Sequence, residues 1–266
     1  MIDAGTVTYF SNQFIIGTLM FVRIAALLST APLFSHAAVQ PMHKIGIAGL
    51  MAITLTTFFW KEQPIIDVHA WYLVGLVAKE FLVGAAIGFS ANLVIMAARF
   101  AGGLLDFDIG FQTALLFDQN ADSPTLIGEL KAMASLMVFL GINGHHFLLE
   151  SMVASFRAVP LDTFALTGSS IEIIIRLITT VTIVAVKIAA PVMIALLVTN
   201  IALALLSRVA PQLNIFALSM QFKVAVGLIV LFITVPLFVM TMKQVMSVFQ
   251  NETFQLLMAL NPKRAS

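Results

Sequence analysis

The sequence predicts an all-α protein with several helices that cross a membrane. The chain has 266 residues, of which 60% are hydrophobic and 10% are charged, and its mean hydropathy is +1.03. A soluble domain carries about 25% charged residues, so this chain has too little charge to cover a globular surface. Four runs contain no Asp, Glu, Lys or Arg: 24–43, 132–149, 188–207 and 224–242. Polar residues do not alternate with apolar ones in these runs, which favours helices over strands.

Six apolar segments follow one another along the chain. They cover residues 12–34, 44–60, 69–98, 127–149, 172–206 and 214–242. A helix needs about 20 residues to span the hydrocarbon core of a bilayer, and the third and fifth segments exceed that length. The fifth also contains Pro191, which removes a backbone donor. We therefore expect each of these two to be a helical hairpin, a bent helix, or a helix that extends well beyond the bilayer.

The longest polar interval, 99–124, holds four Asp and four Phe. Gly102 and Gly103 allow a sharp bend, and 120–124 has the composition of a turn, so we expect a loop. The last apolar segment is followed by 243–260, where polar residues recur at helical spacing. That spacing predicts an amphipathic helix that lies on a membrane or packs on a partner.

No catalytic or metal-binding pattern stands out. His145, His146 and Glu150 do not have metalloprotease spacing, and neighbouring histidines point to different sides of a helix, so we interpret them as a polar helix end. The four Asp of the polar interval are interpreted as solvated acids, and no nucleophile elbow or phosphate-binding loop is present. Cysteine is absent and the net charge is +1, which excludes thiol chemistry and disfavours nucleic-acid binding. We predict neither an enzyme nor a cofactor.

Charged residues inside the apolar segments are candidates for a specific role. They are Arg23, Lys79, Glu80, Lys187 and Lys223. Each would cost about 2.5–3.5 kcal/mol at the centre of a helix in lipid, so such residues face a partner or a polar cavity. Adjacent residues cannot pair on one helix, so Lys79 or Glu80 needs a partner elsewhere. We favour pairing at subunit interfaces; an ion pathway and segments that lie outside lipid are the alternatives.

Ordered landmarks run through the whole chain. In order they are Arg23, 32–34, Pro41, Gly84, 88–89, 102–106, 110–111, Asp118, 143–145, Pro160, 208–216, Lys223 and Gly227. Gly84 and Gly88, four residues apart, also predict close packing of helices. The most specific piece is a predicted hairpin turn that contains Arg208, Pro211, Gln212, Asn214 and Phe216. With these landmarks the chain resembles the FliR family, flagellar export-gate subunits with relatives in injectisomes.

The resemblance implies a fold and a function. Residues 1–171 would form a FliP-like half and 172–242 a FliQ-like half, built from long kinked helical hairpins and followed by the amphipathic segment 243–266. One copy would join FliP and FliQ in a helical ring within the flagellar basal body of the bacterial inner membrane. Its helices would be largely lifted above the bilayer. This ring would export unfolded flagellar polypeptides, with FlhB beside the C-terminus.

The resemblance also assigns residues 106–124 to a loop that plugs the closed pore. Its candidate residues are Gly102, Gly103, Asp106, Phe107, Asp108, Gly110, Phe111 and Phe117. The positive-inside rule places the C-terminus in the cytoplasm by five positive charges to four. A multi-pass secondary transporter with its own small-solute site is the alternative function, in which Gly84 and Pro191 would break their helices. The sequence leaves open whether the chain serves a flagellum or an injectisome.

Overall fold

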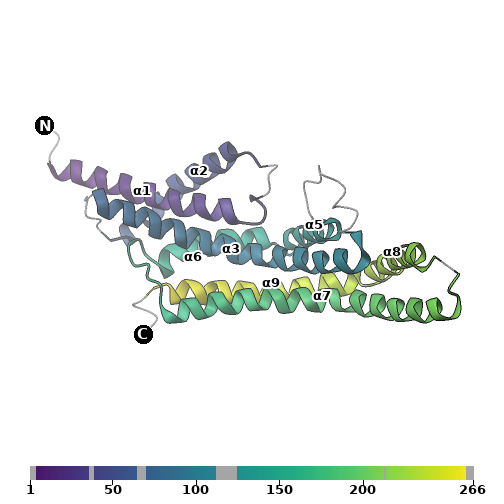
Figure 1. The fold of residues 1–266 in the computed structure, drawn as a ribbon. Helices are drawn as coiled ribbons and strands as arrows, with labels where there is room; N and C mark the ends of the chain where they lie inside the picture. The colour runs from purple at the N-terminus through teal and green to yellow at the C-terminus, as the bar shows by residue number, and fades with distance from the viewer. Residues whose placement is uncertain (1–3, 36–38, 65–69, 112–124, 213, 262–266) are drawn as a thin grey trace. The chain divides into compact units, whose positions relative to one another are not determined.

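The computed structural model describes residues 4–35, 39–64, 70–111, 125–212 and 214–261, and every regular element in these ranges is a helix (Figure 1). This confirms the predicted all-α class. The helices are α1 (Ala4–Thr30), α2 (Pro41–Phe59), the short η1 (Trp60–Glu62), α3 (Ala70–Ile109), α5 (Leu126–Gly141), α6 (Gly144–Ala158), α7 (Gly168–Val209), α8 (Ile215–Ile233) and α9 (Val235–Ala259).

The chain forms two compact units. Unit 1 comprises residues 1–93, 143–177 and 247–266, and unit 2 comprises 94–142 and 178–246. Helices α3, α7 and α9 contribute residues to both units. The predicted halves, 1–171 and 172–242, were defined by resemblance to FliP and to FliQ, whereas the two units are defined by compactness. The two divisions therefore do not test each other, and the predicted halves stay a prediction.

The third and fifth apolar segments are each a single long helix. Helix α3 has 40 residues and α7 has 42, and α7 continues through Pro191. At 1.5 Å per residue they measure about 60 and 63 Å, twice the hydrocarbon core of a bilayer. Of the three expected arrangements, the helical hairpin is therefore wrong for both segments, and Gly84 and Pro191 do not break their helices.

The fourth and sixth segments are interrupted instead. Helix α5 ends at Gly141 and α6 begins at Gly144, and between them Asn143 has a φ of 60°. Helices α8 and α9 meet at a 56° bend around Thr234. Pro236 causes this second break, because proline cannot donate to the preceding turn. Since α9 runs on to Ala259, it joins the end of the sixth apolar segment to the predicted amphipathic helix. By length and composition, four described helices could cross a membrane, or six spans if each bent pair counts as one.

Helices α1 and α3 pack closely within unit 1 because α3 presents glycines to α1 (Figure 1). A Cβ atom on Gly84 would overlap the backbone carbonyl oxygen of Arg23. A Cβ atom on Gly88 would lie 2.5 Å from the carbonyl oxygen of Leu27. The predicted close packing at these two glycines is confirmed.

The glycine contact makes a testable prediction. Gly84→Ala should destabilise the chain by about 2 kcal/mol, because the added methyl group meets rigid backbone. Gly75→Ala is the matched control, since Gly75 lies on the same helix with open space where its Cβ would be. There alanine should stabilise by up to ~1 kcal/mol through helix propensity. Thermal unfolding of the detergent-solubilised variants measures both, and shifts of the same sign would contradict the packing argument.

Candidate functional site

The centre of unit 1 holds a buried arginine. The Arg23 side chain is fully buried, and its Nε donates to Oε2 of the equally buried Glu80 at 2.5 Å. Its Nη1 and Nη2 donate to the carbonyl oxygens of Ser155 and Val159, each at 3.0 Å. The guanidinium also lies 4.6 Å from the centre of the Phe156 ring. These carbonyls end α6, where a cation is favoured, so one side chain ties α1 to α3 and to the C-terminus of α6.

This arrangement corrects the interface interpretation for two of the five charges. Arg23 and Glu80 pair with each other inside the chain, so they are not available at a subunit surface. Lys79, the neighbour of Glu80 on α3, pairs with Asp162 at 3.3 Å, and both side chains are partly exposed. Lys187 is exposed and Lys223 is partly exposed. For these three the interface role stays a prediction.

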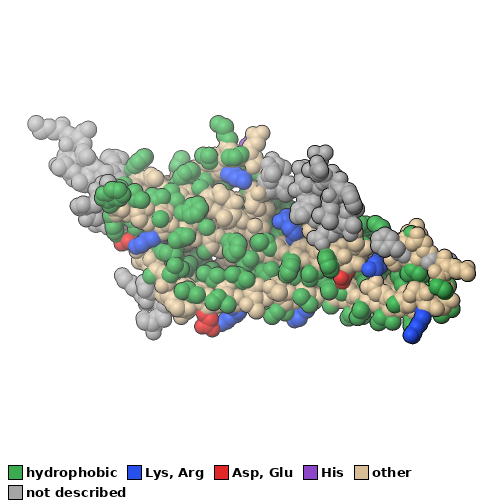
Figure 2. Space-filling view, viewed as in Figure 1, with side chains coloured by type: hydrophobic (Ala, Val, Ile, Leu, Met, Phe, Trp, Pro, Cys, Tyr) green, Lys and Arg blue, Asp and Glu red, His purple; other side chains and the backbone are tan. Residues whose placement is uncertain are grey.

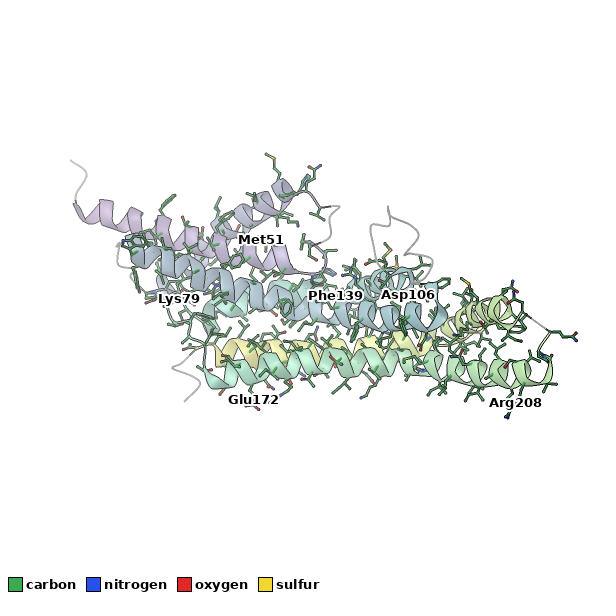
Figure 3. The ribbon with its side chains drawn as sticks, viewed as in Figure 1. Met51, Lys79, Asp106, Phe139, Glu172 and Arg208 are labelled. Carbon is green, nitrogen blue, oxygen red and sulfur yellow. The ribbon has the colours of Figure 1, made fainter. Side chains whose placement is uncertain are left out.

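Unit 2 contains a buried aspartate that caps a helix. Asp106 of α3 is fully buried, and Figure 3 labels it beside α5. Its Oδ1 accepts from the Ile127 backbone N–H at 3.0 Å, and its Oδ2 accepts from the Gly128 backbone N–H at 3.2 Å. Those amides belong to the first turn of α5 and have no partner within the helix. The side chain of Thr125, at the N-cap position, makes no cap hydrogen bond, so the Asp106 carboxylate from α3 caps α5 instead. Its negative charge also interacts favourably with the positive N-terminal end of the α5 dipole.

Close approach of the two backbones makes this cap possible. A Cβ atom on Gly102 would lie 2.5 Å from the backbone nitrogen of Gly128, so only glycine fits between α3 and α5. We therefore name the contact of Asp106 and Gly102 with residues 127–128 the α3–α5 clamp. The clamp holds the C-terminal end of α3 close to the N-terminal end of α5, and the segment 110–125 connects these two ends.

The clamp corrects two expectations. Gly102 and Gly103 do not bend the chain, because α3 continues through them to Ile109 and ends before Gly110, whose φ of 97° favours glycine. Asp106 is not a solvated acid on a loop. The sequence signal for this role is weak, because Asp106 is one of two acids near the end of an apolar helix and Glu129 in the first turn of α5 is a second candidate for the cap.

The remaining plug candidates are only partly described. Phe107 is 71% exposed on α3, and Phe111 is partly exposed just after the helix. Asp108 lines a groove of about 310 Å³ with residues of α7 that include Asn200. Phe117 lies outside the described residues. The plug role of 106–124 thus stays a prediction.

The predicted turn at 208–216 separates two helices. Helix α7 ends at Val209 and α8 begins at Ile215, with Arg208, Pro211 and Gln212 exposed (Figure 3). The side chain of Asn214 accepts from the Ala217 backbone N–H at 3.3 Å and so caps α8. The Phe216 side chain lies outside what the structure describes.

The histidine pair lies in the first turn of α6, with the two ring centres 4.3 Å apart. Among the described residues there is no group of three or more His, Asp or Glu side chains that could hold a metal ion. The described site is therefore a set of buried contacts that hold helices in place.

Comparisons with known proteins agree over most of the chain. Residues 14–249 match the family described as bacterial export proteins, family 1. The chain is 33% identical to the flagellar biosynthetic protein FliR of Bacillus subtilis (strain 168), over 91% of this chain and 94% of that protein. It is 28% identical to the protein of the same name from Escherichia coli (strain K12), over 81% and 82%. It is also 32% identical to the Yop proteins translocation protein T of Yersinia pestis, over 65% and 67%.

Neutralising Glu80 should destabilise the chain far more than neutralising its neighbour Lys79. Glu80→Gln leaves the Arg23 charge buried without its anion, and we expect a loss of about 3–5 kcal/mol. Lys79→Gln removes an exposed ion pair, and we expect less than about 1 kcal/mol. Chemical unfolding in detergent measures both losses. Equal effects would show that the Arg23–Glu80 pair does not hold unit 1 together.

Removing the cap should loosen the start of α5. Asp106→Ala leaves the Ile127 and Gly128 amides without their acceptor, and we expect a loss of about 1–2 kcal/mol, as for other helix caps. Hydrogen exchange should become faster in residues 126–129. Asp108→Ala, two residues away on the same helix, is the control and should leave that exchange unchanged. The capping role is wrong if the two variants exchange alike.

Proposed function

The chain belongs to the bacterial export proteins of family 1, and we propose that it is the single-copy, FliR-type subunit of a flagellar protein export gate. Membership in this family makes it a membrane-embedded component of an export apparatus. In the proposed gate it joins FliP and FliQ in one helical channel in the inner membrane. The cargo is unfolded flagellar polypeptide, and FlhB contacts the cytoplasmic C-terminal part of the chain.

The length of α7 is the observation that supports assembly with other subunits. The helix is about 63 Å long, whereas lipid hydrocarbon covers about 30 Å. Large apolar side chains are nevertheless exposed at both ends, with Ile171 50% and Val209 84% exposed. Hydrophobic side chains likewise cover much of the face shown in Figure 2, between sparse charges. Apolar surface that lipid does not reach needs cover from protein, and helices of FliP and FliQ would supply it.

The α3–α5 clamp supports the plug assignment. Because Asp106 binds the first turn of α5, the segment between Ile109 and Thr125 leaves and rejoins the helices at one place. A segment anchored at both ends can occupy a pore and move aside without unfolding its anchor. Phe107 precedes this segment by two residues and Phe111 lies at its start, and their apolar rings suit contacts that close a channel.

The two helix breaks that the secondary-transporter alternative expected, at Gly84 and Pro191, are absent. Such transporters bind substrate at broken helices near the middle of the membrane. Here α3 and α7 are continuous at Gly84 and Pro191. The buried charges Arg23 and Glu80 already bind each other. The flagellar assignment, rather than the injectisome one, rests on the longer match to flagellar relatives.

Replacing residues 112–122 with a short Gly-Ser linker tests the plug. The change spares Asp106 and the start of α5, so the helices should still assemble. Without the plug we expect the resting gate to leak, measured as potassium release from cells that express the gate. The release should exceed that of the wild type by about tenfold or more, since an open aqueous pore lacks the barrier of a closed one.

A control variant separates a lost plug from a damaged gate. Glu150→Gln changes an exposed residue of α6, outside the plug segment and the clamp, and should leave potassium release at the wild-type level. Membrane fractions must contain equal amounts of each variant. Unchanged release from the linker variant at equal amounts would contradict the plug assignment.

A further inference from the structure

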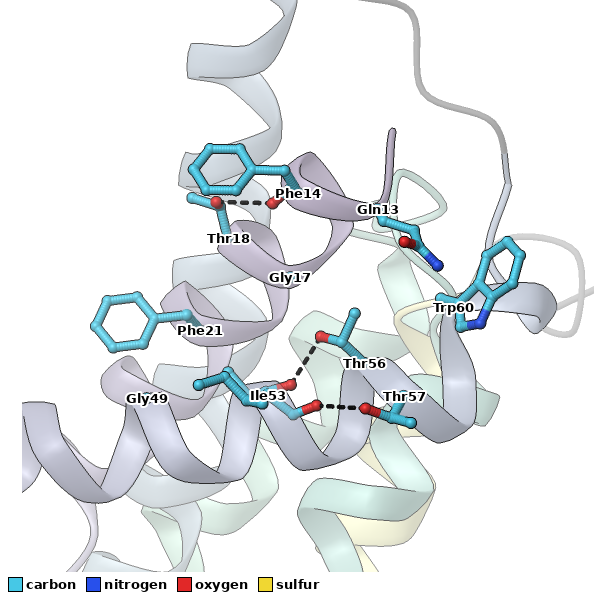
Figure 4. Close-up of a pocket in the computed structure, with 11 residues that line it drawn as sticks. Gln13, Phe14, Gly17, Thr18, Phe21, Gly49, Ile53, Thr56, Thr57 and Trp60 are labelled. Atoms are coloured by element: carbon cyan, nitrogen blue, oxygen red, sulfur yellow. Dashed lines mark hydrogen bonds between the residues drawn. The ribbon is translucent and has the colours of Figure 1, made fainter. Parts of the chain in front are cut away.

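A groove of about 520 Å³ lies between α1 and α2, within unit 1 (Figure 4). Its walls are large apolar side chains: Phe14 and Phe21 from α1, Ile53 from α2, and Trp60 at the end of α2. The groove exists because α1 and α2 present glycines to it. A Cβ atom on Gly17 would lie 3.4 Å from Thr56 Oγ1, and a Cβ atom on Gly49 would meet no atom within 4 Å. Open apolar space of this size suits a small or flexible ligand.

The polar groups along the groove are already engaged. The hydroxyl groups of Thr18, Thr56 and Thr57 donate to the carbonyl oxygens of Phe14, Ala52 and Ile53 at 2.9, 2.7 and 3.0 Å (Figure 4). Each of these bonds stays within one helix, one turn back. The hydroxyl hydrogens are thus not available to a ligand, and the threonines present mainly their methyl groups. The groove therefore selects for hydrocarbon rather than for a polar solute.

Helix α2 has the dimensions of a lipid-facing helix. Its 19 residues measure about 28 Å, close to the hydrocarbon thickness of a bilayer. Only Ala48, Ala52 and Phe59 are buried along it. Its ends carry the residue types that favour the membrane interface, with Lys44 near the start and Trp60 followed by Lys61 at the finish. The groove therefore opens along a helix whose length matches the hydrocarbon core of a bilayer.

The Trp60 end of the groove is positively charged. Lys61 Nζ lies 5.6 Å from the centre of the Trp60 ring, and Arg157 of α6 lies over Phe59 at 5.1 Å. Among the residues that the structure describes here, Glu62 is the one acid paired with these cations, at 3.8 Å from Arg157 Nε. Cations beside an interfacial tryptophan suit the phosphate of a lipid headgroup.

We propose that the α1–α2 groove binds one acyl chain of an anionic membrane phospholipid, whose phosphate lies beside Lys61. The size of the groove favours this occupant over a helix of another subunit. A 19-residue helix about 10 Å wide fills roughly 2,200 Å³, about four times the groove. A hydrocarbon chain, in contrast, lies along the groove between the phenylalanine rings and places its headgroup at the charged end. The bound lipid would fasten α1 to α2 where the protein itself leaves a gap.

Two glycines on α2 provide a matched test. A Cβ atom added at either Gly49 or Gly46 would meet no atom within 4 Å, but of these two glycines only Gly49 lines the groove. The full-length chain is purified in detergent with its co-purifying subunits, and native mass spectrometry counts bound phosphatidylglycerol or phosphatidylcholine with identical acyl chains. Gly49→Leu should weaken lipid binding about tenfold or more, because filling the groove displaces at least two methylene groups. Gly46→Leu should bind as the wild type does.

The headgroup contact is tested separately. Lys61→Gln should reduce the preference for phosphatidylglycerol over phosphatidylcholine while phosphatidylcholine binding persists. The proposal would be overturned if Gly49→Leu bound lipid as the wild type does. It would also be overturned if Gly46→Leu lost as much lipid binding as Gly49→Leu. Loss of co-purifying subunits from Gly49→Leu alone, with lipid binding retained, would overturn it in favour of a helix of another subunit.

Discussion

Helix α7 is twice as long as the hydrocarbon core of a bilayer, and this mismatch constrains everything else the chain can do. A helix satisfies its own backbone hydrogen bonds, so it can leave lipid without exposing unpaired backbone groups. Its apolar side chains, in contrast, are unfavourable in water, and those at both ends of α7 are exposed. Outside lipid, other apolar helices are the cover that remains. Membership in an export family explains why such helices would be at hand.

Inside each compact unit, a buried charged side chain joins helices to one another. In unit 1 the Arg23 guanidinium joins α1, α3 and the end of α6. In unit 2 the Asp106 carboxylate joins α3 to the start of α5. Glycines beside each ion, Gly84 and Gly102, let the backbones approach closely enough for these contacts. Polar contacts thus lie within the units, while their exteriors keep apolar surface for lipid and for other subunits.

The sequence predicted the helical class, the two overlong segments and the close packing at Gly84, because composition and spacing carry those signals. It could not separate a hairpin from one long helix in 69–98, since both have the same hydropathy. The break at Asn143 depends on a left-handed backbone position, which periodicity does not reveal. The role of Asp106 was missed because its partners are backbone amides about 20 residues away. Long-range capping leaves little trace in residue types.

The central claim is that this chain does not function alone but completes a ring of helical export subunits. Native mass spectrometry of the complex isolated from membranes tests it most directly. We expect one copy of this chain with several copies each of FliP and FliQ. A stable particle that contains this chain alone, with α7 immersed in lipid over its whole length, would contradict the account.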